Sequence, residues 1–100
     1  MNIVKLTNGK VELRKDSGTL IRTIVSSGAI QADINGDGSL VLVTTASGKV
    51  ELRKESGTLI RTITSSNAVN AKFSGGDILV MTNKGKTELR KESGTLIRTI

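Results

Sequence analysis

A chain of 100 residues with a single aromatic residue, no histidine and no cysteine excludes several classes of protein at once. It cannot form a disulfide framework or a thiolate metal site, it lacks the usual nucleophile–base pairs of hydrolases, and no apolar run approaches the roughly 20 residues of a membrane-spanning helix. The net charge of +6 would suit an anionic partner.

The length allows at most one small domain, residues 1–100, whose core must consist of Leu, Ile, Val and Ala. The first ten residues lack the apolar segment of a signal peptide. We therefore expect a cytoplasmic protein without membrane contact, or one that is exported by a route that the sequence does not show.

The first 25 residues are predicted to form three short strands. Residues 2–7 are a β-type run that ends at an Asn-Gly dipeptide, which favours a tight hairpin because both residues tolerate positive φ. In residues 10–15 apolar and polar side chains alternate, which predicts a strand with one face covered. A turn at residues 16–18 leads to a third strand, residues 19–25, which is rich in β-branched residues.

The same order of elements then returns with one strand added at its start. Residues 29–34 are a short run of small and apolar residues, and a turn cluster, residues 35–38, separates them from the continuous apolar run of residues 39–45. Such a run is typical of a strand that is buried on both faces. Each full period holds four short strands, A to D in chain order. No segment shows a helical stripe, so the chain is predicted to be all-β.

A sixteen-residue stretch that spans strands C and D occurs three times, with one substitution between neighbouring copies. The copies are Gly9 to Ile24, Gly48 to Ile63 and Gly85 to Ile100, and they start 39 and 37 residues apart. Together they carry twelve basic and six acidic residues, and the rest of the chain is neutral. The net charge is therefore the small excess of basic residues in one hairpin, repeated three times by duplication. A positive charge that arises in this way is no sign of a surface adapted to nucleic acid.

Four strands in a repeat of about 40 residues are typical of a β-propeller blade. The stretch NAVNAKFSGGDILVMTNKGKTELRKESGTLIRTI, residues 67–100, resembles a WD-repeat blade, and the resemblance extends over essentially the whole chain. The family's Trp near the end of strand C is replaced by Arg53 or Arg90, and its Gly-His pair before strand A is absent. The hydrogen-bonded network that these residues support in the family is therefore missing. Pyrroloquinoline-quinone-type propeller repeats share part of the pattern, so the subfamily stays open.

The strand count predicts an incomplete propeller. A partial blade in residues 1–25 and two blades in residues 29–64 and 68–100 make about 2.75 blades, whereas closed propellers have about 4–8. Uncovered apolar blade faces are a liability, so we expect homo-oligomerisation to complete a ring. A dimer, with about six blades, is favoured, and a trimer would give eight or nine. The dimer leaves the inner position of each partial blade to be filled.

Residues 33–39 contain the one sequence motif whose residue types and spacing match those of a known kind of metal-binding loop. Asp33, Asn35 and Asp37 match the D-x-N-x-D-G start of a calcium loop and resemble the loops of calcium-binding integrin-type propeller repeats. The closing position of an EF-hand loop would be Thr44 rather than a glutamate, and the next repeat lacks the ligands. The alternative is a turn between strands A and B in which these residues supply local hydrogen bonds.

Each copy of the repeat carries one glutamate of strand C between basic residues: Glu12, Glu51 and Glu88. This pattern is typical of an ion-paired strand that faces solvent, so we expect no catalytic residue, no enzymatic activity and no cofactor. The arginines beside them would form a symmetric basic band. Nucleic-acid and carbohydrate sites usually add aromatic platforms, and only Phe73 is present, so we interpret the basic residues as solvated edges that prevent edge-to-edge pairing.

The sequence thus favours a non-enzymatic structural or binding module that assembles into a closed ring. The expected partners are further copies of the chain and a protein bound at one face of the ring. The alternatives are a basic surface that binds a polyanion such as nucleic acid, and a calcium-binding repeat. Partner contacts are expected in the loops that differ between repeats: Ser26, Ser27, Ser65, Ser66 and Asn67 between strands D and A, and Asn83 and Lys84 between strands B and C.

Overall fold

The structure, a computed structural model, describes residues 2–100, and these residues form eleven β-strands and no helix. No helix in this part of the chain is therefore long and apolar enough to cross a membrane. The all-β prediction is confirmed. The strands are β1 (Asn2–Thr7), β2 (Lys10–Lys15), β3 (Leu20–Val25), β4 (Ala29–Ile34), β5 (Leu40–Thr45), β6 (Val50–Lys54), β7 (Leu59–Thr64), β8 (Ala68–Ser74), β9 (Asp77–Thr82), β10 (Thr87–Arg90) and β11 (Leu96–Thr99).

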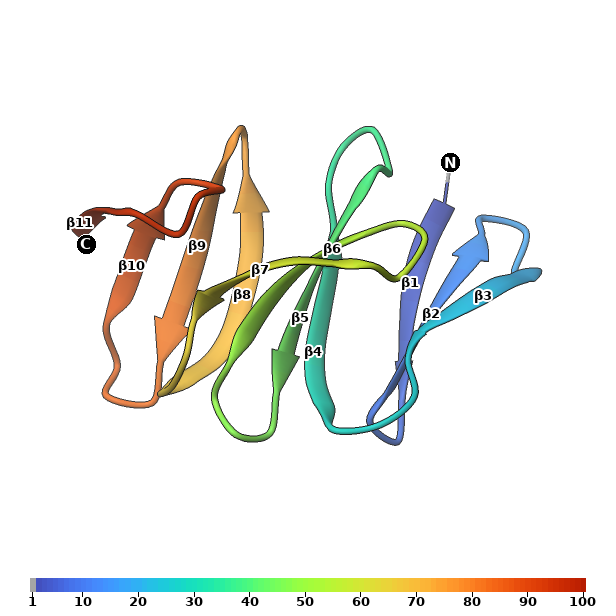
Figure 1. Ribbon diagram of the computed structural model, residues 1–100, viewed down its shortest axis with the longest axis horizontal. Helices are drawn as coiled ribbons and strands as arrows, with labels where there is room; N and C mark the ends of the chain where they lie inside the picture. The colour runs from blue at the N-terminus through green and yellow to red at the C-terminus, as the bar shows by residue number, and fades with distance from the viewer. Residues whose placement is uncertain (1) are drawn as a thin grey trace.

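The strands pair with their neighbours in sequence and form three antiparallel meanders. The first sheet has the order β1-β2-β3, the second β4-β5-β6-β7 and the third β8-β9-β10-β11, and we name them blades 1, 2 and 3. Figure 1 shows the three blades side by side in a row, from blade 1 on the right to blade 3 on the left. The predicted fold class, with two four-stranded blades and one that lacks its first strand, is confirmed.

Blade 2 is packed on both sides, and its strand β5 supplies contacts to both neighbours. Val41 and Val43 are fully buried in the cluster that joins blade 1 to blade 2, whereas Leu42 lies in the cluster that joins blade 2 to blade 3. Successive side chains of a strand point to opposite faces, so one continuous apolar strand serves both junctions. Burial of each such side chain stabilises the fold by about 1.5–3 kcal/mol.

Each copy of the sixteen-residue repeat folds as a hairpin that an arginine holds together. Arg53 donates hydrogen bonds from Nε and Nη2 to Oε1 of Glu51, at 3.1 and 2.9 Å, and from Nη1 to the carbonyl oxygen of Gly57 at 2.7 Å. Arg14 and Arg90 make the corresponding bonds in the other two copies. The arginine therefore ties strand C to the turn that follows it.

The glutamates of blades 1 and 2 do not face solvent, so that part of the prediction from the charge pattern is wrong. Glu12 and Glu51 are only 7% and 9% exposed, because the arginine two residues further on covers each carboxylate. The expected ion pair is present, and the hydrogen bond from Arg14 holds the pKa of Glu12 below its usual value. A carboxylate that is covered from water needs its partner, so these arginines are structural and do not form a free basic band.

The turn between strands B and C of one blade contacts the first strand of the next blade. The amide of Ala68 donates to the carbonyl oxygen of Gly48 at 3.0 Å, and the amide of Ala29 donates in the same way to Gly9. Gly48 has a φ of +90°, and a Cβ atom there would lie 2.6 Å from the amide nitrogen of Asn67. The repeat therefore needs glycine at this position both for its backbone conformation and for the close approach of the next blade.

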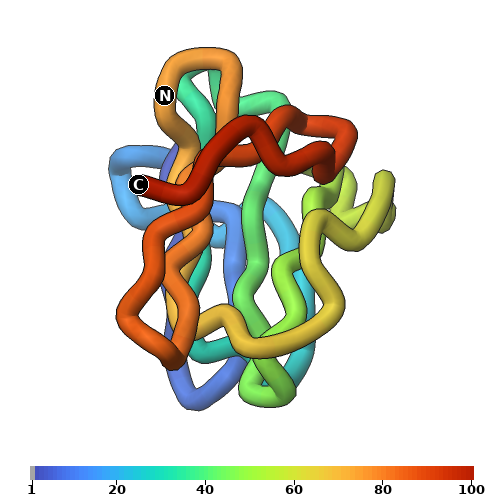
Figure 2. The backbone as a smooth tube through the Cα atoms, turned by 90° about the vertical axis from the view of Figure 1, so that its left-hand side faces the viewer, coloured from blue at the N-terminus to red at the C-terminus, as the bar shows by residue number. Residues whose placement is uncertain are grey.

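Both ends of the row are open in the part of the chain that the structure describes. Strand β1 pairs only with β2, whereas the corresponding strands of blades 2 and 3 have β4 and β8 on their other side. Figure 2 looks at blade 3 end-on, and nothing in residues 2–100 covers its outer face. Ile100 is 73% exposed, whereas Ile24 and Ile63, the same position in the first two copies of the repeat, are 7% and 4% exposed.

Candidate binding pocket between blades 2 and 3

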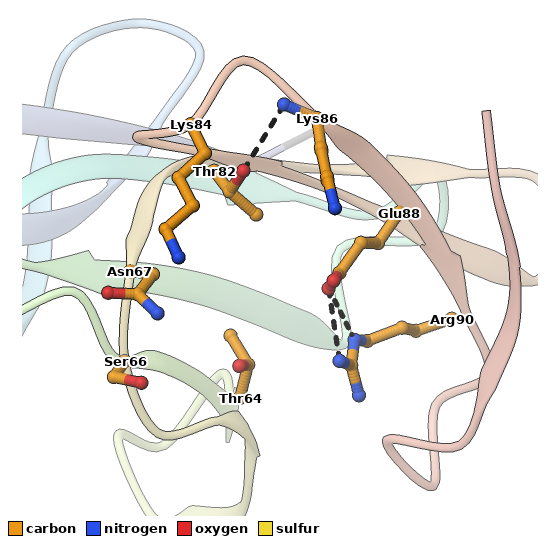
Figure 3. Close-up of a pocket in the computed structure, with 8 residues that line it drawn as sticks. All are labelled: Thr64, Ser66, Asn67, Thr82, Lys84, Lys86, Glu88 and Arg90. Carbon is orange, nitrogen blue, oxygen red and sulfur yellow. Dashed lines mark hydrogen bonds and ion pairs between the residues drawn. The ribbon is translucent and has the colours of Figure 1, made fainter.

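A pocket of about 300 Å³ opens at the junction of blades 2 and 3, and Figure 3 shows the residues that line it. Every lining side chain is polar or charged, so the pocket suits a polar ligand. One wall comes from the end of β7 and the connection that follows it: Thr64, Ser66 and Asn67. The other wall comes from blade 3: Thr82, Lys84, Lys86, Glu88 and Arg90.

A backbone hydrogen bond joins the two walls, because the amide of Asn83 donates to the carbonyl oxygen of Asn67 at 2.8 Å. Within the blade 3 wall, the amide of Gly85 donates to the carbonyl oxygen of Thr82 at 3.1 Å and closes the turn. Asn67 has a φ of +71°, a left-handed conformation that asparagine tolerates better than most residues. The connection after β7 and the turn before β10 therefore form one unit, and Figure 3 shows the Lys84 side chain reaching towards Asn67.

The charges in the pocket do not cancel. Nη2 of Arg90 lies 3.0 Å from Oε1 of Glu88, and its Nη1 donates to the carbonyl oxygen of Gly94 at 2.7 Å, so the arginine and the glutamate neutralise each other. Lys84 and Lys86 form no ion pair with any of the residues that the structure describes. The pocket therefore carries two positive charges without an acidic partner.

The neutral groups of the pocket are also free to bind. Oγ1 of Thr82 accepts a hydrogen bond from the amide of Lys86 at 3.2 Å, which leaves the hydroxyl hydrogen available as a donor. The side chains of Thr64, Ser66 and Asn67 make no hydrogen bond to other described residues. Three hydroxyl groups and one amide can thus donate to a ligand without breaking a bond inside the protein.

The structure brings three of the loop residues predicted from the sequence into this pocket: Ser66, Asn67 and Lys84. Two other predicted residues, Ser65 and Asn83, lie in the same two loops and do not line the pocket.

Ser26 and Ser27 belong to the corresponding connection between blades 1 and 2, away from the pocket. That connection is tied to the next loop in the same way, because the amide of Ala46 donates to the carbonyl oxygen of Gly28 at 2.8 Å. All of these loops lie along the lower edge of the row in Figure 1, and the β4–β5 and β8–β9 turns lie at the opposite edge.

Five lining residues were not selected from the sequence. Strand register explains why Glu88 and Arg90 face the pocket: Glu88 lies opposite Val80, which is buried between blades 2 and 3. The same register applied to the alternating pattern of the repeat would have indicated this face. The residues that sequence analysis missed are Thr64, Thr82, Lys86, Glu88 and Arg90.

The residues of the calcium motif use their oxygen atoms in hydrogen bonds within the protein. Oδ2 of Asp33 accepts from the amide of Phe73 at 2.9 Å, across the junction with blade 3. Oδ1 of Asn35 accepts from the amide of Leu40 at 3.0 Å. The bond of Asn35 matches the alternative in which the motif shapes the turn between strands A and B, whereas the bond of Asp33 joins blade 2 to blade 3.

Asp37 completes this turn. Its Oδ1 accepts from Oγ and from the amide of Ser39, at 2.6 and 2.9 Å, and the Ser39 hydroxyl contributes most to lowering the pKa of Asp37 below its usual value. No group of three or more acidic, histidine or cysteine side chains that could hold a metal occurs within residues 2–100. Calcium binding by Asp33, Asn35 and Asp37 stays a prediction.

The arrangement of the three blades is similar to part of known β-propellers. The crystal structure of BamB from Moraxella catarrhalis superimposes with a TM-score of 0.75 and 17% sequence identity, over 97% of this chain and 31% of that chain. The WD40 β-propeller domain of Doa1 gives a TM-score of 0.69 and 17% identity, over 96% of this chain and 38% of that chain. No family model and no curated protein sequence matches the chain.

The class of fold follows from these matches. The chain spans about a third of the length of each of the two solved structures, and almost all of it is covered. At 17% identity the similarity concerns the fold alone. The protein therefore has the fold of a partial β-propeller, and the predicted propeller class is confirmed.

Proposed function

We propose that this chain is a non-enzymatic scaffold of WD-repeat-like blades, which completes a propeller ring with a second copy of itself and binds a partner at the loops between blades. The observation that carries the proposal is the exposure of Ile100, which is 73%, against 4% for Ile63. The two residues occupy the same position in nearly identical hairpins, and Ile63 is buried because blade 3 covers it. The outer face of blade 3 therefore has the chemistry of a face that a further blade covers.

Other residues of blade 3 support this interpretation. Leu79 and Leu89 are half-buried, whereas Leu42 and Leu52, which occupy the same register in blade 2, are 1% and 2% exposed. Covering such a face removes apolar surface from water at about 25 cal/mol per Å². A second chain that presents its blade 1 to this face would continue the row, and two chains would hold about six blades.

The face of blade 1 that would receive it is more polar. Ile3 is 43% exposed on this face. Lys5 occupies the register of Val43 in blade 2, because each lies opposite the glutamate of strand C. Docking would cover the Lys5 ammonium, and the carboxylate of Glu12 opposite it is already held by Arg14. The proposed interface therefore requires this lysine to find another carboxylate partner.

A non-enzymatic role is supported by the state of the acidic side chains. The sequence contains no histidine or cysteine, and the glutamates at the blade junctions accept hydrogen bonds from arginine. A general base must be free to take a proton, and a carboxylate held by a guanidinium is not. The loops at the lower edge of Figure 1 then remain as the surface for a partner.

Light scattering on the purified chain tests the ring. We expect a mass about twice the 10.6 kDa of one chain. Ile100→Lys should shift the protein to the monomer, because a charge on the outer face of blade 3 opposes docking, and it should leave the monomer folded because Ile100 is already exposed. Leu96→Lys is the matched control. Leu20, Leu59 and Leu96 are 48%, 46% and 47% exposed in the three copies, so neighbouring blades do not cover this position.

A stable monomer at all concentrations would overturn the ring. If Leu96→Lys dissociated the dimer to the same extent as Ile100→Lys, the proposed interface would also be contradicted. Of these two residues, Ile100 alone lies on the face of blade 3 that is expected to be covered.

A further inference from the structure

We propose that the pocket between blades 2 and 3 binds a small organic phosphate, such as a sugar phosphate. This site lies within one chain, so it does not depend on ring closure. It goes beyond a scaffold that binds a protein, because it assigns a small-molecule ligand to three of the variable loop residues, Ser66, Asn67 and Lys84.

The charges of the pocket indicate a doubly negative ligand. Lys84 and Lys86 line the same pocket, and neither has an ion-pair partner in residues 2–100. A phosphate monoester carries nearly two negative charges at neutral pH, and lysine ammonium groups bind phosphate as point charges. Figure 3 shows the two ammonium groups on either side of the Thr82 side chain.

The neutral donors and the size of the pocket indicate what the phosphate is attached to. The hydroxyl groups of Thr64, Ser66 and Thr82 and the amide of Asn67 can bind phosphate oxygens or the hydroxyls of a sugar. The volume of about 300 Å³ is at the lower end of ligand pockets, which fits a ligand of sugar-phosphate size. No aromatic side chain lines the pocket, so nothing there would stack on a nucleobase.

The junction of blades 1 and 2 serves as an internal reference. Repeat alignment places Ser47 at the position of Lys84, Gly28 at that of Asn67 and Val25 at that of Thr64. The first junction thus lacks one positive charge and two polar side chains, while the charged residues of its hairpin are the same: Lys49, Glu51 and Arg53.

The hydroxyl groups at the two junctions also differ in their bonding. At the first junction Oγ1 of Thr45 and Oγ of Ser47 are hydrogen-bonded at 2.9 Å. At the second junction Lys84 replaces this serine, so the corresponding Thr82 hydroxyl has no such partner. The exchange of serine for lysine therefore adds a charge and frees a donor at the same place.

Glu88 is the one group in the pocket that opposes an anion. Its carboxylate is held by Arg90 at 3.0 Å, which reduces the repulsion without removing it. Glu88→Gln should therefore tighten phosphate binding several-fold. A residue with only a structural role would not improve binding when it is changed.

The test is a titration of the full-length protein at low salt, followed by amide chemical shifts and by calorimetry. The probes are glucose 6-phosphate, inorganic phosphate and glucose. We expect glucose 6-phosphate to bind in the millimolar range or tighter, inorganic phosphate to bind more weakly, and glucose not to bind. The shifts should concentrate at residues 64–67 and 82–86 and be small at residues 25–28 and 45–49.

Two variants separate the site from general attraction to a basic protein. Lys84→Ser should weaken binding of glucose 6-phosphate by about tenfold, since it removes one of two charges that contact the phosphate. Lys49→Ser removes one positive charge from the first junction, at the position that corresponds to Lys86, and should leave binding unchanged. Neither Lys84 nor Lys49 forms an ion pair with the described residues, so neither variant should change the melting temperature.

The outcomes that overturn the proposal are distinct. Equal weakening by Lys84→Ser and Lys49→Ser would mean diffuse electrostatic attraction. Tighter binding of a single-stranded oligonucleotide than of glucose 6-phosphate, with steep weakening by salt, would mean a polyanion surface instead. Absence of shifts at residues 64–67 and 82–86 would mean that no phosphate site exists there.

Discussion

The hairpins of blades 2 and 3 have almost the same sequence and very different surroundings. Leu52 is 2% exposed, whereas Leu89, at the same position one repeat later, is half-buried; Ile63 and Ile100 differ more strongly, at 4% and 73%. The local conformation is shared, including the arginine that bonds to the glutamate and to the turn. Burial is therefore decided by the neighbouring blade and not by the sequence of the hairpin. The same substitution in both blades measures what one junction contributes.

The largest difference is expected for the core leucine of strand C. Leu52→Ala should lower the free energy of unfolding by about 3 kcal/mol, because it leaves a cavity at the junction with blade 3. Leu89→Ala should cost about 1 kcal/mol, since its side chain already meets solvent on one side. Urea unfolding of both variants at low protein concentration checks this difference.

Protein concentration provides the control for this pair. If chains associate through blade 3, the cost of Leu89→Ala rises with concentration, and that of Leu52→Ala does not. Equal costs at low concentration would contradict the view that burial depends on the neighbouring blade.

The glycine that begins the repeat should show the next largest difference. In Gly48→Ala the new Cβ would lie 2.6 Å from the amide nitrogen of Asn67, and the residue would keep a φ of +90°. Gly85 has a φ of +80° but nothing within 4 Å of a Cβ atom. Gly85→Ala should therefore cost only the conformational strain, about 1–2 kcal/mol, and Gly48→Ala should cost more, because the blades must also move apart.

Thermal unfolding of both glycine variants measures this pair. Amide shifts at residues 66–68 should change in Gly48→Ala and stay constant in Gly85→Ala. An equal loss of stability in the two variants would mean that the contact between blades contributes nothing at this position.

The period and the strands could be predicted from the sequence because they depend on local chemistry. Alternation of apolar and polar residues, Asn-Gly and Gly-containing turns, and the apolar run of β5 each specify a strand or a turn within a few residues. The four-stranded period then followed from repetition. These elements agree with the structure because every strand pairs with its neighbours in sequence, so short turns and local patterns are enough to specify the pairing.

The environment of the glutamates and the pocket could not be predicted in the same way. Alternation places Glu51 on a polar face, but that face becomes covered when Arg53 bonds to the turn at Gly57. The pocket needs Lys84 beside Asn67, and the bond between Asn83 and Asn67 that places them there joins two blades. The loops could be selected because they vary between repeats, but the residues of the repeat that face them required the strand register.

The smallest expected difference concerns the turns between strands A and B. Blade 2 closes this turn with Asp37, whose carboxylate accepts hydrogen bonds from the hydroxyl and the amide of Ser39, whereas blade 3 uses Gly75 and Gly76. The Ser39 hydroxyl contributes most to lowering the pKa of Asp37 in the folded protein. The ionised carboxylate therefore stabilises the fold fully above the aspartate pKa of the unfolded chain, about 3.9, and this contribution is lost as the pH falls through the folded-state pKa.

Asp37→Asn should accordingly lower the melting temperature slightly at pH 7, and the difference from the unchanged protein should shrink at acidic pH and vanish below the folded-state pKa. A carbon-detected NMR titration of the Asp37 carboxyl group gives that pKa directly and should place it below the usual aspartate range. A difference in melting temperature that persists unchanged to low pH would show that the asparagine alters the turn by its shape, and that the charge of Asp37 is not what stabilises it. Addition of calcium at pH 7 separates the two interpretations of the motif: if Asp37 serves only the turn, calcium leaves both melting temperatures unchanged, whereas a calcium site formed with Asp33 and Asn35 raises the melting temperature of the unchanged protein alone.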